Sequence, residues 1–208
     1  PIAMVIPNID VDSSSYEAFK DTPRPGTADY TARIKYHAKN DHRGSGIFSG
    51  RMTAAIVAAG SIAKQLLAQR GIEVLAHVVQ VGKQRVERQV TDGEIRSRVY
   101  TNEVRCADPD VSIKMKREIA WAQRMGDSVG GIVECRVLGV PIGIGEPFFD
   151  SVESVMSHAM FSIPGVKGIE FGSGFSGAAM GGSENNDPFA MRGDDVVLLK
   201  NDAGGILG

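Results

Sequence analysis

The stretch TAAIVAAGSIAKQLLAQRGIEVLAHVVQV, residues 53–81, carries the clearest secondary-structure signals of the chain. From Thr53 to Gln69 apolar residues recur every three or four positions, and Gly71 then ends the pattern as a helix terminator does. From Gly71 to Val81 apolar residues alternate with others, which is typical of a strand. We therefore predict a helix over 53–69, largely buried because its many small side chains suit close packing, and a strand over 71–81.

Two further helices are predicted on either side of a strand. Asp108 is a natural N-cap, Pro109 suits the first helical position and Gly126 suits a C-terminal cap, so residues 108–126 should form a helix. Its apolar stripe would comprise Met115, Ile119, Ala122 and Met125. A third helix is expected over 150–161, with Asp150 and Glu153 resembling a capping box.

Several strands complete the predicted architecture. Residues 131–138 should form a half-buried strand, with the apolar Val133, Cys135 and Val137 on one face and Glu134 and Arg136 on the other. Further strands are expected over 2–6, 166–171 and 196–199. This mixture of helices and strands indicates the α+β or the α/β class.

Composition limits the class of protein. The 208 residues suit one large domain over 1–208, or at most two small ones. The 23 basic against 25 acidic residues give a net charge of −2, which argues against a protein that coats nucleic acid. Two cysteines, Cys106 and Cys135, exclude a disulfide framework. No apolar run approaches the roughly 20 residues that span a bilayer, so we expect no membrane partner and a cytoplasmic location. Glycine makes up 25 of the 208 residues, about 12%, against roughly 7% in average usage. This excess predicts left-handed turns or close backbone approaches.

Three weaker motifs are interpreted structurally. Residues 83–105 interleave basic and acidic side chains, which predicts a polar hairpin or insertion turning near Asp92-Gly93 rather than a nucleic-acid surface. Gly172–Gly177 fits the G-x-G-x-x-G pattern, but no apolar helix follows, so a glycine-rich loop is favoured over a dinucleotide fold. The four histidines lack metal-ligand spacing, and no metal is expected; they are His37, His42, His77 and His158.

Two arginine-bearing loops are the strongest candidate site. Arg24-Pro-Gly precedes Asp29, and a glycine-rich loop over 43–53 carries Arg51 at the start of the best helix. Glycines let the backbone approach a ligand, and arginines can hold a phosphate or carboxylate with two hydrogen bonds. These residues predict a site for an anionic small molecule, while surface ion pairs for Arg24 and Arg51 are an equal alternative.

These same segments resemble chorismate synthases, in order and nearly end to end. Arg24-Pro-Gly-Thr-Ala-Asp29 resembles the family's RPGHAD signature, and the segment Gly44–Thr53 resembles its GGGRSSARET loop. Further segments that resemble family motifs are 1–10, 145–150, 162–170, 182–187 and 203–208. Because family members are longer on both sides, we expect a chain truncated at both ends.

The resemblance implies a carbon–oxygen lyase of the shikimate pathway, which serves aromatic amino acid biosynthesis. Chorismate synthase eliminates phosphate from 5-enolpyruvylshikimate 3-phosphate in a 1,4-anti manner, giving chorismate. It requires reduced FMN, without net redox change, and NADPH or another reductant would recycle the flavin. The implied fold is α+β, with helices sandwiched between antiparallel β-sheets, and the implied assembly is a homotetramer.

The resemblance also assigns residues. Arg24 and Arg51 match arginines that hold the anionic substrate. The residues that match flavin contacts are Ile47, Phe48, Ser49, Pro164, Gly165 and Gly208.

One departure concerns catalysis, because Thr27 stands where the family has a histidine that protonates the reduced flavin. A threonine hydroxyl does not titrate near pH 7. His37 and His42 are the local candidates for another donor, and we expect the 208-residue chain by itself to be inactive. The alternative function is a non-catalytic anion- or flavin-binding domain related to the family.

Overall fold

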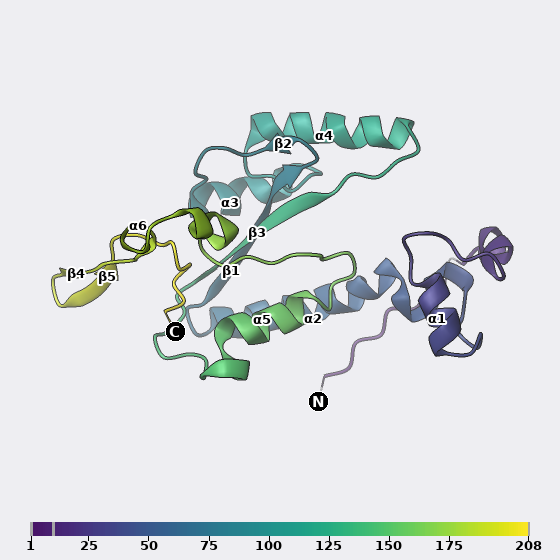
Figure 1. The fold of residues 1–208 in the computed structure, drawn as a ribbon, viewed down its shortest axis with the longest axis horizontal. Helices are drawn as coiled ribbons and strands as arrows, with labels where there is room; N and C mark the ends of the chain where they lie inside the picture. Colours follow the sequence, from purple (N-terminus) through teal and green to yellow (C-terminus); the bar gives the residue numbers. More distant parts are fainter. Residues whose placement is uncertain (1, 10, 208) are drawn as a thin grey trace. The chain divides into compact units, whose positions relative to one another are not determined.

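The computed structural model describes residues 2–9 and 11–207 (Figure 1). The chain forms two compact units, one made of residues 1–59 and 143–208 and the other of residues 60–142. Helix α2 (Thr53–Ala68) begins in the first unit and ends in the second, at nearly the predicted bounds. The prediction of a single domain over 1–208 stays a prediction.

The unit of residues 60–142 is built on a three-stranded antiparallel sheet in the order β2-β1-β3. Strand β1 (Glu73–Val81) pairs with β2 (Gln84–Arg85) and with β3 (Gly131–Leu138). Helices α3 (Asp92–Arg98) and α4 (Pro109–Arg124) pack against this sheet. The core between them is small and apolar, and its fully buried members include Ile95, Met115 and Cys106.

The two faces of β3 divide as predicted, and the polar face, which is half-buried, is the less exposed of the two. In β1, the buried Leu75 and His77 lie opposite Arg136 and Glu134 of β3. The apolar residues Val133, Cys135 and Val137 lie on the other face and are exposed. The polar pair can face the helices because Arg136 donates hydrogen bonds to the Val90 carbonyl, at 2.8 Å, and to Asp92 and Glu134.

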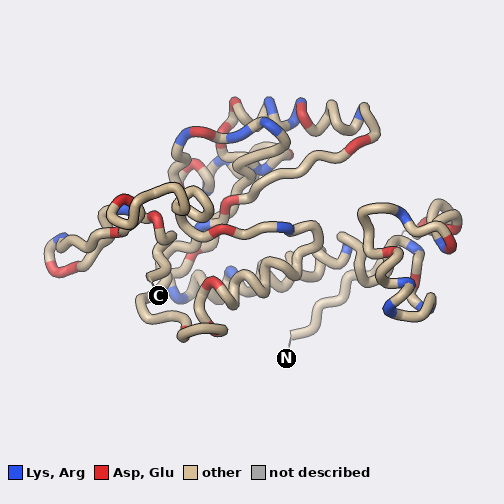
Figure 2. The backbone as a smooth tube through the Cα atoms, viewed as in Figure 1, with Lys and Arg blue, Asp and Glu red and all other residues tan. Residues whose placement is uncertain are grey.

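The hairpin predicted to turn near Asp92-Gly93 is wrong, because α3 and the short 3₁₀ helix η4 (Val99–Thr101) run through that position, whereas the alternative of an insertion over 83–105 stays a prediction. Thr91 is the N-cap of α3, and Glu94 completes a capping box with it, so Asp92-Gly93 begins a helix instead of turning a hairpin. Basic and acidic residues are interleaved over this unit (Figure 2).

Helix α4 confirms its predicted caps. Asp108 accepts hydrogen bonds from the backbone N–H groups of Asp110 and Val111, and Gly126 has φ +65° just beyond the helix. Its apolar stripe is only partly confirmed: Met115 and Ala122 are buried, whereas Ile119 and Met125, the latter at the C-cap, are exposed.

The first 59 residues contain little of the predicted structure. Residues 2–9 have no regular secondary structure, so the strand over 2–6 is wrong: a strand needs a partner, and no described strand pairs with it. Three 3₁₀ helices and a short α-helix occupy the rest: η1 (Ser14–Phe19), α1 (Asp29–Lys35), η2 (Arg43–Phe48) and η3 (Gly50–Met52). The expected burial of the helix after Arg51 is also wrong, since α2 has no buried residue and its apolar Ile56, Val57 and Leu66 lack covering neighbours among the described residues.

Residues 143–207 contain short elements joined by glycine-rich turns. After η5 (Phe148–Asp150), helix α5 (Val152–Met160) has Ser151 as its N-cap, so the predicted cap at Asp150 is displaced by one residue. The hairpin of β4 (Phe189–Arg192) and β5 (Asp195–Leu198) confirms the strand expected near 196–199. Residues 166–171 pair with no described strand and remain irregular, which makes that predicted strand wrong.

The segment 172–177 is not a dinucleotide-binding turn. It follows no strand and leads into η6 (Gly174–Ala179) and then α6 (Gly182–Asn185), both short. Every strand pair of the described residues is antiparallel, so the fold is α+β, as predicted. In the described part of the chain, no helix is both long and apolar enough to cross a membrane.

Candidate functional site

Arg24 is fixed from several sides. Its Nε and Nη2 atoms donate to the two carboxylate oxygens of Asp29, at 2.8 and 3.0 Å, and Nη2 also donates to the Ser45 hydroxyl at 2.7 Å. The guanidinium carbon lies 5.3 Å from the ring centroids of both Tyr16 and Phe19. The hydrogen bonds from Arg24 hold the pKa of Asp29 below its usual value. Arg24 therefore joins η1, the start of α1 and the glycine-rich loop.

Thr27 shapes the turn that carries Arg24. Its hydroxyl donates to the Arg24 carbonyl oxygen at 3.0 Å and accepts from the Asp29 backbone N–H at 3.2 Å. Gly26 of the same turn has φ +71°. The hydroxyl of Thr27 is thus engaged within the turn, and a hydroxyl does not titrate near neutral pH.

The loop that precedes α2 has an unusual backbone. Gly44, Ser45 and Gly46 have φ values of +58°, +65° and +51° in succession. A Cβ on Gly46 would lie 3.0 Å from the Asp41 carbonyl oxygen, so glycine is needed there for the close approach as well as for φ. This tight path brings the Gly44 carbonyl oxygen within 3.2 Å of Arg51 Nη2.

Arg51 has fewer side-chain contacts than Arg24. Its side chain donates to the Gly44 carbonyl but forms no ion pair with a carboxylate of the described residues, and the residue is exposed. Ser49 caps η3 by accepting from the Arg51 backbone N–H at 3.2 Å. A guanidinium with unused donors beside a glycine-lined loop can bind a phosphate or carboxylate.

A pocket of about 400 Å³ lies beside this loop. Ile47 and Phe48, two of the predicted flavin contacts, line it together with Tyr36, whose ring centroid is 6.3 Å from that of Phe48. His37 also lines the pocket, as do two lysines without an ion-pair partner among the described residues, Lys35 and Lys39, and Asp41, whose carboxylate is paired with Arg43. An apolar aromatic wall beside positive charge suits a planar ring system that carries an anionic group.

The other predicted flavin contacts lie in a separate turn. The Val166 N–H donates to the Ile163 carbonyl oxygen at 3.3 Å, with Pro164 and Gly165 between them and φ +89° at the glycine, which is the pattern of a type II turn. No hydrogen bond or ion pair of the described residues joins this turn to Arg24, Arg51 or the 43–48 loop. Gly208 lies outside the described residues.

Two of the family-like segments, 182–187 and 203–208, come together with the glycine-rich loop 172–177. The buried Asp187 carboxylate accepts from the backbone N–H groups of Asp202 and Ala203, at 2.7 and 2.9 Å. The Ser173 N–H donates to the Asp202 carbonyl at 2.6 Å, and a Cβ on Gly172 would lie 2.0 Å from that oxygen. Close backbone contact of this kind accounts for part of the glycine excess.

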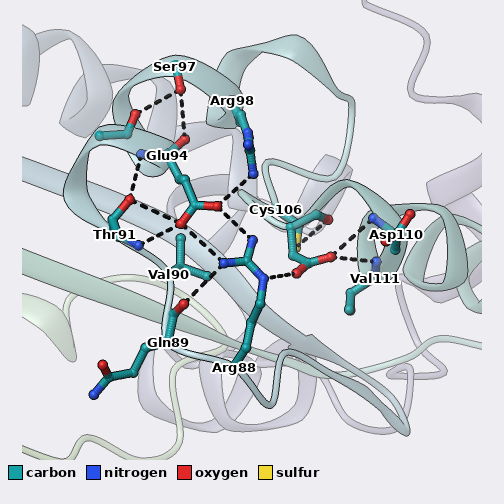
Figure 3. A network of polar contacts seen from close by, with 12 residues as sticks. Arg88, Gln89, Val90, Thr91, Glu94, Ser97, Arg98, Cys106, Asp110 and Val111 are labelled. Atoms are coloured by element: carbon teal, nitrogen blue, oxygen red, sulfur yellow. Dashed lines mark hydrogen bonds and ion pairs between the residues drawn. The ribbon is translucent and has the colours of Figure 1, made fainter.

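An ion-pair network in the unit of residues 60–142 holds helices α3 and α4 together and lies apart from the residues predicted to bind ligands. Arg88 donates to Glu94 at 3.0 and 3.1 Å and to Asp108 at 2.6 Å, and Arg98 also donates to Glu94 (Figure 3). The bonds from Arg88 lower the pKa of Glu94 to about 2. The network joins the caps of α3 and α4.

His77 is the buried titratable group of the sheet. Its side chain is 1% exposed, neither ring nitrogen has a hydrogen-bond partner among the described residues, and Nε2 lies 3.5 Å from Glu134 Oε2. Burial lowers the pKa of His77, with Glu134 opposing that effect. As predicted, His77 lies in a strand and His158 on a helix, α5. The described residues contain no cluster of three or more side chains suited to a metal ion.

Sequence reasoning missed Tyr16, Phe19 and Ser45. The three approach Arg24 through contacts that no local pattern encodes. Arg24 and Asp29 do meet, and the neighbouring glycine-rich loop contributes Ser45, so two of the segments singled out from the sequence form one site.

Comparison with known proteins shows the family to which the chain belongs. The family model described as chorismate synthase matches residues 1–208. The chorismate synthase of Korarchaeum cryptofilum is 48% identical over 208 residues, and that of Pyrococcus abyssi is 50% identical over 209 residues. In both comparisons all of this chain is covered and 57% of the relative, so the chain spans somewhat more than half the length of these relatives.

A solved structure shows the same fold. A crystal structure of chorismate synthase superposes with a TM-score of 0.77 at 30% sequence identity, covering 86% of this chain and 57% of that one. The order of motifs, the antiparallel α+β architecture and these matches lead to one assignment. The chain belongs to the chorismate synthase family.

Proposed function

We propose that the whole protein to which this chain belongs is a chorismate synthase. It would act on 5-enolpyruvylshikimate 3-phosphate, breaking the carbon–oxygen bond to phosphate while a proton leaves C6, and release chorismate and phosphate. The observation that carries the proposal is the family match over all 208 residues. The arginine-bearing glycine loop supports it, because this substrate has two carboxylates and a phosphate that need cationic partners.

Arg24 and Arg51 would contact the substrate in different ways. Arg51 has no carboxylate partner among the described residues and can turn its guanidinium toward an anion. Arg24 is neutralised by Asp29, but its Nη1 atom donates to no described residue, so this amino group can still bind an anion. Both residues would bind and orient the substrate without transferring a proton, since guanidinium groups stay protonated.

The pocket beside the glycine loop fits part of a flavin. Ile47, Phe48 and Tyr36 offer an apolar wall, and Lys35 and Lys39 offer charge for a phosphate. Reduced FMN, when bound, would lend an electron transiently and accept the C6 proton. Ser49 at the cap of η3 and the turn of Pro164 and Gly165 would add further contacts, as the family resemblance implies.

The chain differs from the family pattern at the residue that would protonate the reduced flavin, where Thr27 replaces the family's histidine. Thr27 would keep its turn in place, while His37, which shares the pocket with Ile47 and Phe48, would deliver the proton. His42 is less well placed for this role, because it does not line that pocket and its Nε2 lies 3.7 Å from Glu17.

The state of the whole protein is part of the same proposal. A homotetramer, a cytoplasmic location and NADPH as the reductant of the flavin would follow the family. The 208-residue chain by itself should be inactive and bind FMN poorly, since several of the family's contacts lie outside it.

A second function has one observation in its favour. Thr27 is not an acid, so a flavin- or anion-binding protein without catalysis is the alternative. The test is to incubate the full-length protein with reduced FMN and 5-enolpyruvylshikimate 3-phosphate without oxygen and to measure phosphate and chorismate. Release of both in equal amounts supports the enzyme, whereas tight binding of both ligands without turnover supports the alternative.

A further inference from the structure

We propose that Tyr16, Phe19, Asp29 and Ser45 form a positioning cage that holds the Arg24 guanidinium so that its Nη1 amino group faces the anionic substrate. The inference rests on the proposed function, which it deepens by assigning a role to η1 and to Asp29. Neither has a role among the residues that the family resemblance assigns.

Hydrogen bonds determine the plane of the guanidinium. Asp29 accepts from Nε at 2.8 Å and from Nη2 at 3.0 Å, in the two-pronged geometry that orients arginine most strictly. The Asp29 carboxylate also accepts from the Arg24 backbone N–H at 3.2 Å, which ties both ends of the residue to one group. The Ser45 hydroxyl accepts a second bond from Nη2, at 2.7 Å. Three of the guanidinium's five N–H groups are thereby used, and the two on Nη1 remain.

Aromatic rings restrict the guanidinium further. Tyr16 and Phe19 lie three residues apart in η1, and both ring centroids are 5.3 Å from Arg24 Cζ, within the range of cation–π contacts. The Arg24 side chain is 24% exposed and that of Asp29 is 14% exposed. The guanidinium is thus largely enclosed but keeps some access to solvent.

A cage of this kind favours binding because the Arg24 side chain has already lost its conformational entropy before the ligand arrives. A free arginine side chain loses rotamer freedom when it grips a ligand, whereas a guanidinium that is already held loses little. The cage also sets the position of Ser45, whose backbone φ of +65° lies in the middle of the glycine loop. Arg24 and the loop that leads to Arg51 are therefore held together before the substrate arrives.

Asp29→Asn separates positioning from simple charge. If Asp29 acts only through its charge, neutralising it makes the site more positive and tightens the binding of an anion. If Asp29 positions Arg24, the same change frees the guanidinium and weakens binding. The two roles thus predict opposite signs for one substitution.

The experiment uses the full-length protein with reduced FMN, and measures KM and kcat for 5-enolpyruvylshikimate 3-phosphate. We expect Asp29→Asn to raise KM about tenfold or more, with a smaller change in kcat. The double variant Tyr16→Leu/Phe19→Leu should raise KM by roughly tenfold, while Tyr16→Phe, which keeps the ring, should stay close to wild type. Asp29→Glu should recover part of the loss.

Matched controls come from the same segment. Asp21→Asn removes the same charge from a side chain that is 79% exposed and pairs with Arg33, and Tyr30→Leu removes an aromatic ring that is 63% exposed. Both controls should leave KM unchanged. Thermal unfolding of every variant reports whether the fold persists. The NMR signal of the Arg24 Nε–H, which is assigned as the one that disappears in Arg24→Lys, reports whether the cage persists.

The outcomes distinguish this inference from the function on which it rests. A lower or unchanged KM for Asp29→Asn, with the fold intact and with Arg51→Ala still raising KM, would overturn the cage but leave the proposed function standing. Loss of the Arg24 Nε–H signal in the double variant without any effect on KM would also overturn it. A wild-type protein that neither binds nor converts the substrate would overturn both.

Discussion

The hydroxyl of Thr27 bridges the two ends of its turn, donating to the Arg24 carbonyl at 3.0 Å and accepting from the Asp29 N–H at 3.2 Å. Thr27 therefore keeps Arg24 and Asp29 in register, a role that an imidazole at this position would fill differently. The turn that carries the candidate anion site is held by the same residue that replaces the family's acid.

Thr27→Val should lower activity modestly and reduce stability. The substitution keeps the side-chain shape but removes both hydrogen bonds, each worth about 0.5–1.5 kcal/mol. Thr27→Ser should behave like wild type, and Thr27→His should keep or raise the rate of chorismate formation. Steady-state kinetics and thermal unfolding of the full-length protein check this. An inactive wild type whose activity is restored by Thr27→His would instead show that the function was lost.

His37→Gln should lower kcat by roughly 10²–10⁴-fold if His37 delivers the proton, because that is the usual contribution of a positioned acid or base. Glutamine keeps hydrogen-bonding capacity but does not titrate, so flavin binding should change little. The matched control is His42→Gln, which alters a histidine outside the pocket. Equal rates for wild type and His37→Gln would remove His37 from the mechanism.

Arg51→Ala should weaken substrate binding by about 1.5–3 kcal/mol, the range of hydrogen bonds to charged groups. Arg51 is exposed and has no carboxylate partner among the described residues, so its removal leaves no buried charge behind. The free energy of unfolding should therefore stay near that of wild type. Isothermal titration with the substrate measures the loss, and Arg51→Lys should recover only part of it because lysine lacks the two-pronged geometry.

Glu94 should make the structure sensitive to acid. Its pKa is lowered to about 2, chiefly by the hydrogen bonds from Arg88, whereas the unfolded value is near 4.3. Because the folded pKa is the lower one, the stabilisation is fully present above the unfolded pKa and is lost as pH falls from about 4.3 toward 2. Denaturant unfolding of Glu94→Gln should show a weaker dependence on pH in this window. An identical pH dependence in the variant would contradict the assignment.

His77 should also destabilise the fold as pH falls, in a higher window. Burial lowers the folded pKa below the unfolded value near 6.5, so the unfolded chain binds a proton that the folded chain does not. Stability is full above the unfolded pKa and decreases as pH falls below about 6.5. An NMR titration of His77 should give a pKa under 6.5, and His77→Leu should reduce the pH dependence. A pKa above 6.5 would mean that Glu134 outweighs burial.

The sequence predicted correctly those elements whose ends are set by capping residues close to them in the chain. The helix over 108–126 was predictable because Asp108, Pro109 and Gly126 act within one turn of its ends. The capping box of Thr91 and Glu94 was equally local and could have been found, but Asp92-Gly93 also fits a hairpin turn and masked it. Such ambiguity arises where one short sequence suits two turn types.

The sequence by itself determined the family, the α+β class and the order of the motifs, and it predicted a candidate anion site at Arg24 and Arg51. Only the tertiary structure decided which face of β3 meets the helices, since Arg136 can be placed there only when Val90, Asp92 and Glu134 supply its partners. The same holds for Arg24, whose partners Tyr16, Phe19 and Ser45 lie up to 21 positions away in the chain. The physical reason is that caps and turns form within a few residues, whereas burial and ion pairing depend on contacts between segments that fold together.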